Sequence, residues 1–381
     1  MKEEIKNKFI ELFGTIPVLF KAPGRVNLIG EHTDYNEGFV LPAAIDRQIT
    51  FAVAKNKVNK YRFYAFDLHK SFEINIENLN KSGVHWANYL LGVIAQFKKK
   101  NIIVGGLDCV FGGNIAIGAG LSSSAALEVG IANSINDIFG YGLEKMELIK
   151  MAQIAEHEYA GVMCGIMDQF ASMNGKNNHV LKIDCRSFEF EYFPLELADY
   201  RIVLCDTLVK HSLASSEYNT RRKECETGIE IIKKYKPQVN SLRDISLDTL
   251  KGHQHKIDPI VFKRCKFVIE ENQRLEDACK ALIDRDLKSF GEKMYGSHYG
   301  LRDEYEVSCK ELDYLQEYAE NHTGVIGARM MGGGFGGCTI NLVKLNNVDS
   351  FAMEISEAYK NKFNIEPRTF VVKIEDGAGR I

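Results

Sequence analysis

The stretch Gly118-Ala119-Gly120-Leu121-Ser122-Ser123-Ser124-Ala125-Ala126 decides how the rest of the 381-residue chain is interpreted. Apolar residues recur at helical spacing from its end onward, so we expect a helix that begins near Ser122. A helix start needs one capping hydroxyl, so two of the three serines are not required for capping. Glycines let a backbone approach a ligand closely, and the free N–H groups of a helix start attract anions. The stretch therefore predicts a phosphate-binding loop, with an ordinary capped helix as the alternative.

The composition is typical of a soluble, globular chain. Apolar residues make up 45% and charged residues 26% of the sequence, which excludes a largely disordered protein. The length is sufficient for two or three domains. A formal net charge of -3 provides no general attraction to nucleic acid or to an anionic membrane. We therefore expect neither as a partner.

The cysteines and the N-terminal segment indicate the compartment. The nine cysteines are scattered and form no CxxC pair, so the sequence predicts neither a zinc site nor a disulfide framework. Residues 1–13 combine charges with apolar positions at helical spacing, which favours an amphipathic helix over a signal peptide. No apolar run approaches the ~20 residues that a membrane span needs. Because free thiols are typical of a reducing compartment, we expect a cytoplasmic protein.

A polar cluster follows the first predicted strand. Apolar residues over positions 26–29 indicate a short strand that ends at Gly30, and Glu31, His32 and Asp34 come directly after it. Carboxylates accept hydrogen bonds from neighbouring hydroxyls and histidine can donate or accept, so these side chains could surround a small polyol. The alternatives are a polar turn and a metal site. The Glu-His-x-Asp spacing does not place two metal ligands on one face.

Two more carboxylates occur in unusual surroundings. Glu156 lies in a predicted helix over residues 144–159, and Asp168 lies between apolar residues in the segment 164–170. A buried carboxylate must be paired or hydrogen-bonded, so both are candidates for chemistry. The alternatives are a solvated helix position for Glu156 and a helix N-cap for Asp168.

The second half of the chain is predicted to be rich in helices, after a boundary near residues 195–200. Near its end, the glycine cluster at 332–337 formally contains GxGxxG. A dinucleotide fingerprint must open a helix, whereas residues 338–343 alternate like a strand, so we exclude that kind of site. The glycines instead bring backbone close to a bound group or turn a hairpin. GxxxxGK[ST] is absent, so any nucleotide site is not a P-loop.

Taken together and in this order, the motifs resemble those of the GHMP kinases and, within them, the galactokinases. GRVNLIGEHTDY at residues 24–35 is similar to the galactokinase signature, which other GHMP kinases do not share. GAGLSSSAA at 118–126 is similar to the family's ATP-phosphate loop, and GARMMGGGFGGCTI at 327–340 to its third motif.

Further segments add to the resemblance, which runs from about Phe20 to the C-terminus. They are residues 164–170, Ser297-His298, Leu301-Arg302-Asp303 and the tail 376–378. Glu37 stands where a glycine is common in the family, and we expect this departure to matter little.

The resemblance implies an α+β fold of two lobes. The N-terminal lobe, expected over residues 1–195, would be like the second domain of ribosomal protein S5. The C-terminal lobe, expected over 196–381, would be a ferredoxin-like unit with extra helices, and the active site would lie between the two. The resemblance also implies an enzyme that uses ATP to phosphorylate the anomeric hydroxyl of α-D-galactose. The product, galactose 1-phosphate, would be the entry compound of galactose breakdown. We expect a monomer, although the sequence does not fix the oligomeric state.

The roles of individual residues are likewise implied by the resemblance. Asp168 would be the catalytic carboxylate, which takes the hydroxyl proton or mainly orients the hydroxyl, and Arg25 would lie beside it. The sugar pocket would consist of Glu31, His32, Asp34, Gly165 and Tyr218. The phosphates of ATP would be wrapped by Gly118, Ala119, Gly120, Leu121, Ser122, Ser123 and Ser124. The ligands of Mg²⁺ would be Ser124 and Glu156.

Three alternative functions remain open at this point. A kinase for N-acetylgalactosamine or arabinose would keep these motifs, because one pocket residue can decide whether a substituent at C2 is accepted. A mevalonate or homoserine kinase is disfavoured, since an acidic substrate would need cations where Glu31 and Asp34 stand. A galactose- and ATP-binding regulator without turnover, like some yeast relatives of galactokinases, would lack residues of the serine-rich loop, but residues 124–126 are intact. The sequence does not identify the residues that contact adenine.

Overall fold

A six-stranded sheet forms the centre of the N-terminal lobe in the computed structural model, which describes residues 1–116, 118–210 and 214–381. Its strand order is β13-β1-β3-β6-β4-β5, and all neighbours are antiparallel except the parallel pair β4 and β6. The strands are β1 (Val18–Asn27), β3 (Pro42–Lys55), β4 (Lys60–Ala65), β5 (Lys70–Asn75), β6 (Leu107–Gly113) and β13 (Gly379–Arg380).

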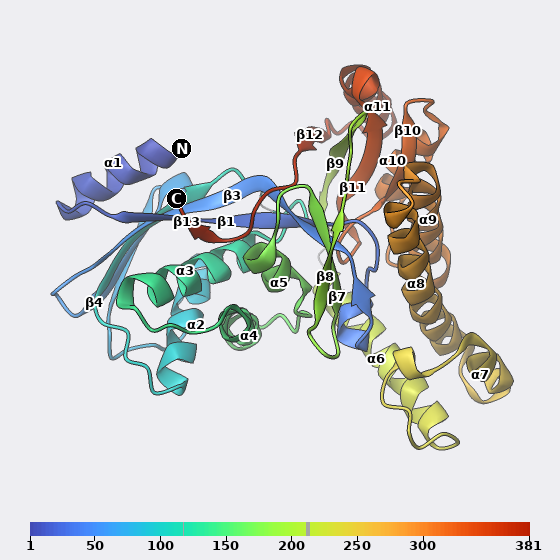
Figure 1. The fold of residues 1–381 in the computed structure, drawn as a ribbon, viewed down its shortest axis with the longest axis horizontal. Coiled ribbons are helices and arrows are strands. Elements are labelled where there is room, and N and C mark those ends of the chain that lie inside the picture. Colours follow the sequence, from blue (N-terminus) through green and yellow to red (C-terminus); the bar gives the residue numbers. More distant parts are fainter. Residues whose placement is uncertain (117, 211–213) are drawn as a thin grey trace.

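Helices cover both faces of this sheet (Figure 1). Side chains alternate between the two faces of a strand, so Leu19 of β1 packs under α1 while Phe20 enters the larger core below α2 to α5. The helices are α1 (Lys2–Phe13), α2 (His85–Lys99), α3 (Ser123–Phe139), α4 (Lys145–Ala155) and α5 (Met167–Asn174). The chain after α4 continues as a π-helical turn, η3 (Glu156–Ala160). The helices expected at residues 1–13, near Ser122 and at 144–159 are thus confirmed.

The C-terminal lobe is built on a four-stranded antiparallel sheet of order β10-β11-β9-β12. Its strands are β9 (Tyr200–Lys210), β10 (Val325–Met330), β11 (Gly336–Lys344) and β12 (Arg368–Val372). Its helices are α6 (Ala214–Lys233), α7 (Leu247–Gly252), α8 (Pro259–Ile283), α9 (Leu287–Tyr299), α10 (Lys310–Asn321) and α11 (Val348–Phe363). The glycine cluster at 332–337 turns the chain from β10 into β11, which confirms that it opens a strand and not a helix.

A small sheet, β2-β7-β8, lies between the lobes in Figure 1. Its strands are β2 (Phe39–Val40), β7 (His179–Asp184) and β8 (Phe190–Pro194). One hydrophobic core continues from the N-terminal lobe into α8, α9 and β11. The expected division at residues 195 and 196 falls between β8 and β9, and it stays a prediction. The C-terminal tail returns across this boundary to the N-terminal lobe, because Phe20 of β1 pairs with Arg380 of β13.

The first strand differs from its prediction. We expected it to end at Gly30, but β1 ends at Asn27. The Asn27 side-chain amide donates to the Gly30 carbonyl, 3.2 Å away, and so closes a turn that takes the chain out of the sheet. Residues 28–33 consequently form a loop that leads into the short helix η1 (Asp34–Asn36). None of the described helices is long and apolar enough to cross a membrane.

Close packing of α3 against the central sheet positions the loop that precedes this helix. A Cβ atom on Gly130 would lie 2.1 Å from the ring of Phe51, which is fully buried in β3. Glycine at this helix position costs about 1 kcal/mol relative to alanine. The close approach of α3 to β3 requires glycine at position 130.

We therefore expect Gly130→Ala to lower the free energy of unfolding by about 1–3 kcal/mol, because overpacking outweighs the gain in helix propensity. Gly252→Ala is the matched control, since no atom lies within 4 Å of a Cβ at that position. Without overpacking, the control should be as stable as the parent or more stable by up to about 1 kcal/mol. Urea unfolding measures both variants, and a Gly130→Ala variant as stable as the parent would show that α3 does not need this approach.

Candidate active site

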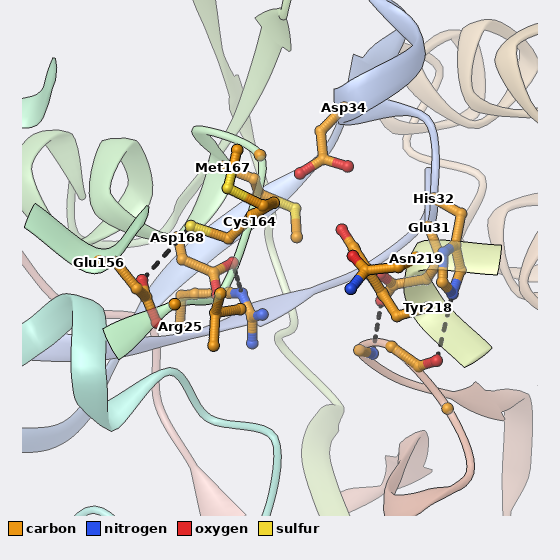
Figure 2. A pocket seen from close by; sticks show the side chains of 17 residues that line it. Arg25, Glu31, His32, Asp34, Glu156, Cys164, Met167, Asp168, Tyr218 and Asn219 are labelled. Carbon is orange, nitrogen blue, oxygen red and sulfur yellow. Dashed lines mark hydrogen bonds and ion pairs between the residues drawn. The ribbon is translucent and has the colours of Figure 1, made fainter. Parts of the chain in front are cut away.

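Two cavities lie near the serine-rich loop: one is lined by Arg25 and Asp168, which the loop contacts, and the other by residues of the loop itself. The first, here called the polar cavity, has a volume of about 300 Å³ and lies between the lobes. Of the residues predicted from the sequence, the polar cavity is lined by Arg25, Glu31, His32, Asp34, Glu156, Gly165, Asp168 and Tyr218. The second, here called the apolar cavity, has a volume of about 460 Å³ and includes Ser123 and Ser124 in its wall. Figure 2 shows Arg25, Glu156 and Asp168 on one side of the polar cavity and Glu31 and His32 on the other.

Arg25 and Asp168 form a pair that the serine-rich loop holds from two sides. The Arg25 Nε atom donates to Asp168 Oδ1 at 2.8 Å, and its Nη1 atom donates to the Gly120 carbonyl at 2.6 Å. The Ser122 hydroxyl donates to Asp168 Oδ2 at 2.5 Å. Asp168 lies in the first turn of α5, whose N-cap is Ile166, so the N-cap alternative for Asp168 is wrong.

The backbone around Arg25 explains its position. The register between β1 and β3 shifts between Pro23 and Arg25, and such irregularities redirect side chains. The Arg25 N–H donates to the Leu121 carbonyl at 3.2 Å. A Cβ on Gly24 would lie 2.5 Å from that same carbonyl oxygen. Glycine at 24 therefore lets the serine-rich loop lie directly against β1.

Glu31 is held by the opposite lobe. Its Oε1 atom accepts from Arg329 Nη2 at 2.5 Å and from the Gly332 N–H at 2.8 Å. Both side chains of the ion pair are buried. Arg329 also donates to the Asn27 carbonyl and to the Ser297 hydroxyl, at 3.2 and 3.3 Å. Sequence reasoning assigned no role to Arg329, although a cation between the apolar residues of β10 is a signal of a buried partner.

The hydrogen bonds around His32 define where its proton lies. Burial lowers the pKa of His32 to about 3, so the ring is neutral. Its Nε2 atom faces the Gly333 carbonyl at 3.3 Å, and a carbonyl only accepts, so Nε2 carries the hydrogen. Nδ1 must then accept from the Tyr35 hydroxyl at 2.7 Å. The Tyr35 oxygen in turn accepts from Tyr305 at 2.8 Å, and Tyr305 accepts from the Cys225 thiol.

Asp34 lies opposite Asp168, and among the described residues no cation forms an ion pair with it. Burial, followed by the charge of Asp168, raises the pKa of Asp34 to about 7. A Cβ on Gly165 would lie 1.7 Å from Asp34 Oδ2, so any other residue at 165 would displace the Asp34 carboxylate. The ring of Tyr218, on α6, lies 5.3 Å from the ring of His32 and closes the same side of the cavity.

Glu156 belongs to a cluster of carboxylates beside the serine-rich loop. It is buried, which excludes the solvated alternative. The Gln169 amide donates to Glu156 at 2.7 Å and to the buried Glu128 at 3.2 Å. Burial and the charge of Asp168 raise the pKa of Glu156, and a hydrogen bond with the Ser124 hydroxyl opposes this effect. Sequence reasoning missed Glu128 and Gln169, because neither has an unusual local pattern.

The carboxylate and hydroxyl oxygens of Glu156 and Ser124 are of the type that Mg²⁺ prefers, and a bivalent cation would offset the crowded negative charge. The described part of the chain contains no group of three or more His, Cys, Asp and Glu side chains arranged for a metal. Mg²⁺ bound together with phosphates needs only one or two protein ligands, so the pair is compatible with such an ion.

Family models of known proteins match three parts of the chain. Residues 7–55 match the family model of the galactokinase galactose-binding signature. Residues 88–176 match the N-terminal domain and residues 278–361 the C-terminal domain of GHMP kinases.

Full-length relatives match as well. The chain is 41% identical to a galactokinase of Thermotoga maritima over 362 residues, which are 95% of this chain and 99% of that protein. It is 42% identical to a galactokinase of Clostridium tetani over 382 residues, covering 99% and 97% of the two chains.

Solved structures show the same fold. The galactokinase of Lactococcus lactis in complex with galactose has a TM-score of 0.95 and 34% identity, over 100% of this chain and 99% of that one. A mevalonate kinase of Methanococcus jannaschii shares the fold at a TM-score of 0.67 and 19% identity, with coverages of 96% and 100%.

The raised pKa of Asp34 leads to a test by unfolding. Between the ordinary pKa of an aspartate and about 7, the folded protein keeps a proton on Asp34 that the unfolded chain has lost. The contribution of Asp34 to stability therefore falls as pH rises through this range and is least favourable above about pH 7. We expect Asp34→Asn to be more stable than the parent by about 1 kcal/mol or more at pH 8, with a smaller gain at pH 5.

Urea unfolding at the two pH values measures this difference. Asp199→Asn, at an exposed position outside both cavities, is the control and should stay within about 0.5 kcal/mol of the parent at both. An Asp34→Asn variant less stable than the parent at pH 8 would contradict the interpretation.

Proposed function

Since the chain belongs to the galactokinase family, we propose that it transfers the γ-phosphoryl group of ATP to the anomeric hydroxyl of α-D-galactose, giving galactose 1-phosphate and ADP. The observation that carries the proposal is the polar cavity, which has a volume of about 300 Å³. In it, the polar side chains of the galactose-binding signature face the Arg25–Asp168 pair. The serine-rich loop borders the same pair.

Galactose is bound by a mixed set of donors and acceptors in this proposal. Glu31 has one oxygen committed to Arg329 and Gly332, which leaves Oε2 to accept from a sugar hydroxyl. Asp34 is a second acceptor. His32 is the donor among the three: its Nε2 hydrogen makes only a long, 3.3 Å contact with the Gly333 carbonyl, and in this proposal it is shared with a sugar oxygen. The galactose in the Lactococcus lactis structure supports this choice of sugar.

ATP is the phosphoryl donor of this kinase family, and we place its adenine in the apolar cavity. The wall of that cavity is aromatic, with Phe66, Trp86, Tyr89 and Phe111 among the lining residues. Such walls suit a flat base. Ser123 and Ser124 lie at the start of α3 in the same cavity, so the phosphates would extend toward the helix N-terminus and the polar cavity.

Ser124 and Glu156 are the residues that would hold Mg²⁺. The ion, when bound with the nucleotide, supplies positive charge that neutralises the phosphate oxygens and withdraws charge from the leaving group. Gln169 keeps Glu156 in place through its 2.7 Å hydrogen bond.

Asp168 and Arg25 are the residues that act on the reacting hydroxyl. Phosphoryl transfer depends mainly on positioning and on electrostatic stabilisation, with a carboxylate to orient the attacking hydroxyl and take its proton. Asp168 has this position in the cavity wall. The Arg25 guanidinium bridges Asp168 and the Gly120 carbonyl, so it places positive charge where the acceptor oxygen and the phosphoryl group meet.

We further propose that the enzyme acts as a monomer in the cytoplasm. Both cavities are lined by one chain, so no second copy is needed to complete the site. The nine cysteines are all free thiols, as is usual for proteins of a reducing compartment.

Asp168→Asn tests the assignment of the catalytic carboxylate. It removes a proton acceptor but not the pocket, so we expect loss of turnover by at least about 100-fold, with galactose binding within about tenfold of the parent. ADP release is measured with ATP and Mg²⁺ against galactose, N-acetylgalactosamine, arabinose, glucose and mevalonate, and calorimetry measures binding.

The panel also separates the alternatives. Turnover with another sugar alone would change the substrate but keep the site. Galactose binding without ADP from any sugar would make the protein a regulator, and near-normal turnover in Asp168→Asn would refute the role of this residue.

Glu156→Gln tests the metal assignment. We expect it chiefly to raise the Mg²⁺ concentration needed for half-maximal rate, by about tenfold or more, because a neutral amide is a poorer ligand. Glu158→Gln, two residues further along η3 and paired with Lys99 outside the cavity, is the control. A magnesium titration of Glu156→Gln that matches the control would remove Glu156 from the metal site.

A further inference from the structure

The three serines of the loop face in different directions. Ser123 and Ser124 line the apolar cavity. Ser122 lines neither cavity, and its hydroxyl donates to Asp168 Oδ2 at 2.5 Å, on the sugar side of the loop. The sequence-based assignment placed all three among the phosphate ligands, and the geometry separates Ser122 from the other two.

The backbone of Ser122 adopts a conformation that is unfavourable for serine. Its φ of 56° and ψ of 50° lie in the left-handed region, where a residue with a Cβ atom costs about 1 kcal/mol or more and glycine costs little. The hydroxyl does not cap the helix, although Ser122 is the N-cap residue of α3. A glycine would therefore suit the backbone better. What serine adds at this position is the hydrogen bond to Asp168.

That hydrogen bond closes a ring of contacts between the serine-rich loop and the Arg25–Asp168 pair. Arg25 bridges Asp168 Oδ1 and the Gly120 carbonyl, and Ser122 holds Asp168 Oδ2 from two residues further along the loop. Both carboxylate oxygens are thus directed by donors, and two of the contacts come from the loop that would carry the ATP phosphates.

We propose that Ser122 is a positioning residue for the phosphoryl transfer. It orients the carboxylate of Asp168 toward the sugar hydroxyl and ties that carboxylate to the phosphate loop, so that acceptor and donor are aligned together. This inference rests on the proposed function. It assigns Ser122 to the step that follows binding and leaves contact with the phosphates to Ser123 and Ser124.

The proposal makes a specific kinetic prediction. Ser122→Ala removes the hydroxyl, so Asp168 loses one of its two directing contacts, and misplacement of a reacting group typically costs about 10- to 100-fold in rate. We expect kcat to fall by this factor while the KM values for ATP and for galactose stay within about threefold. Ser122→Gly removes the hydroxyl and also relieves the backbone strain, and it should lose the same factor.

The two variants together separate the possible roles. A rise in the KM for ATP of more than tenfold with kcat near the parent's value would make Ser122 a phosphate ligand and overturn the proposal. Full activity in Ser122→Gly would overturn it too, because the backbone and not the hydroxyl would then matter. Thermal unfolding confirms that each variant is folded, and Ser122→Gly remains informative if Ser122→Ala does not fold.

A third measurement addresses the link to Asp168. Adding Ser122→Ala to Asp168→Asn should lower the residual rate by less than about twofold, since the contact is already altered. A further tenfold loss would contradict the link. Absence of galactose phosphorylation in the unmodified chain would instead refute the proposed function, so the two failures are distinguishable.

Discussion

The Arg25–Asp168 ion pair is the interaction on which the rest of the site depends. A buried guanidinium is costly unless its donors are used, and Arg25 uses them on Asp168 and on the Gly120 carbonyl. Three features of the fold are needed to bring these groups together: the irregularity of β1 at Gly24, the start of α5, and a loop with left-handed residues before α3. The loop that would bind phosphate and the carboxylate that would bind the acceptor hydroxyl are therefore positioned by one another.

A second constraint joins the two lobes on the sugar side. Glu31 of the galactose-binding signature is bound by Arg329 and by the backbone of Gly332, both from the C-terminal lobe. Behind them, Ser297 contacts Arg329 and donates to Glu271 at 2.6 Å, and Glu271 also accepts from the Gly30 N–H at 2.9 Å. A carboxylate fixed in this way presents one free oxygen in a defined direction. The sugar site thus exists only where both lobes meet, and the shared hydrophobic core keeps them in contact.

Local patterns in the sequence predicted much of this, and long-range contacts account for what they did not. The helix after Ser122, the strand after the glycine cluster and the polar residues after β1 follow from spacing and residue type within short segments. Arg329 gains its role only from Glu31, 298 residues away, and Gln169 joins Glu156 to Glu128, which is 41 residues from it. The last strand, β13, pairs with the first. The proton position on His32 depends on Gly333 and Tyr305, about 300 and 270 residues away. A short sequence segment cannot reveal these contacts, because they form only when the chain folds.

The central claim is that the cleft phosphorylates the anomeric oxygen of galactose, and the most direct test is to identify the product. Phosphorus-31 and proton NMR of a reaction with ATP, Mg²⁺ and galactose report which carbon carries the new phosphate. We expect a phosphate coupled to the anomeric proton, with one ADP formed for each galactose consumed. Phosphate on another carbon, or release of inorganic phosphate without a sugar product, would contradict it.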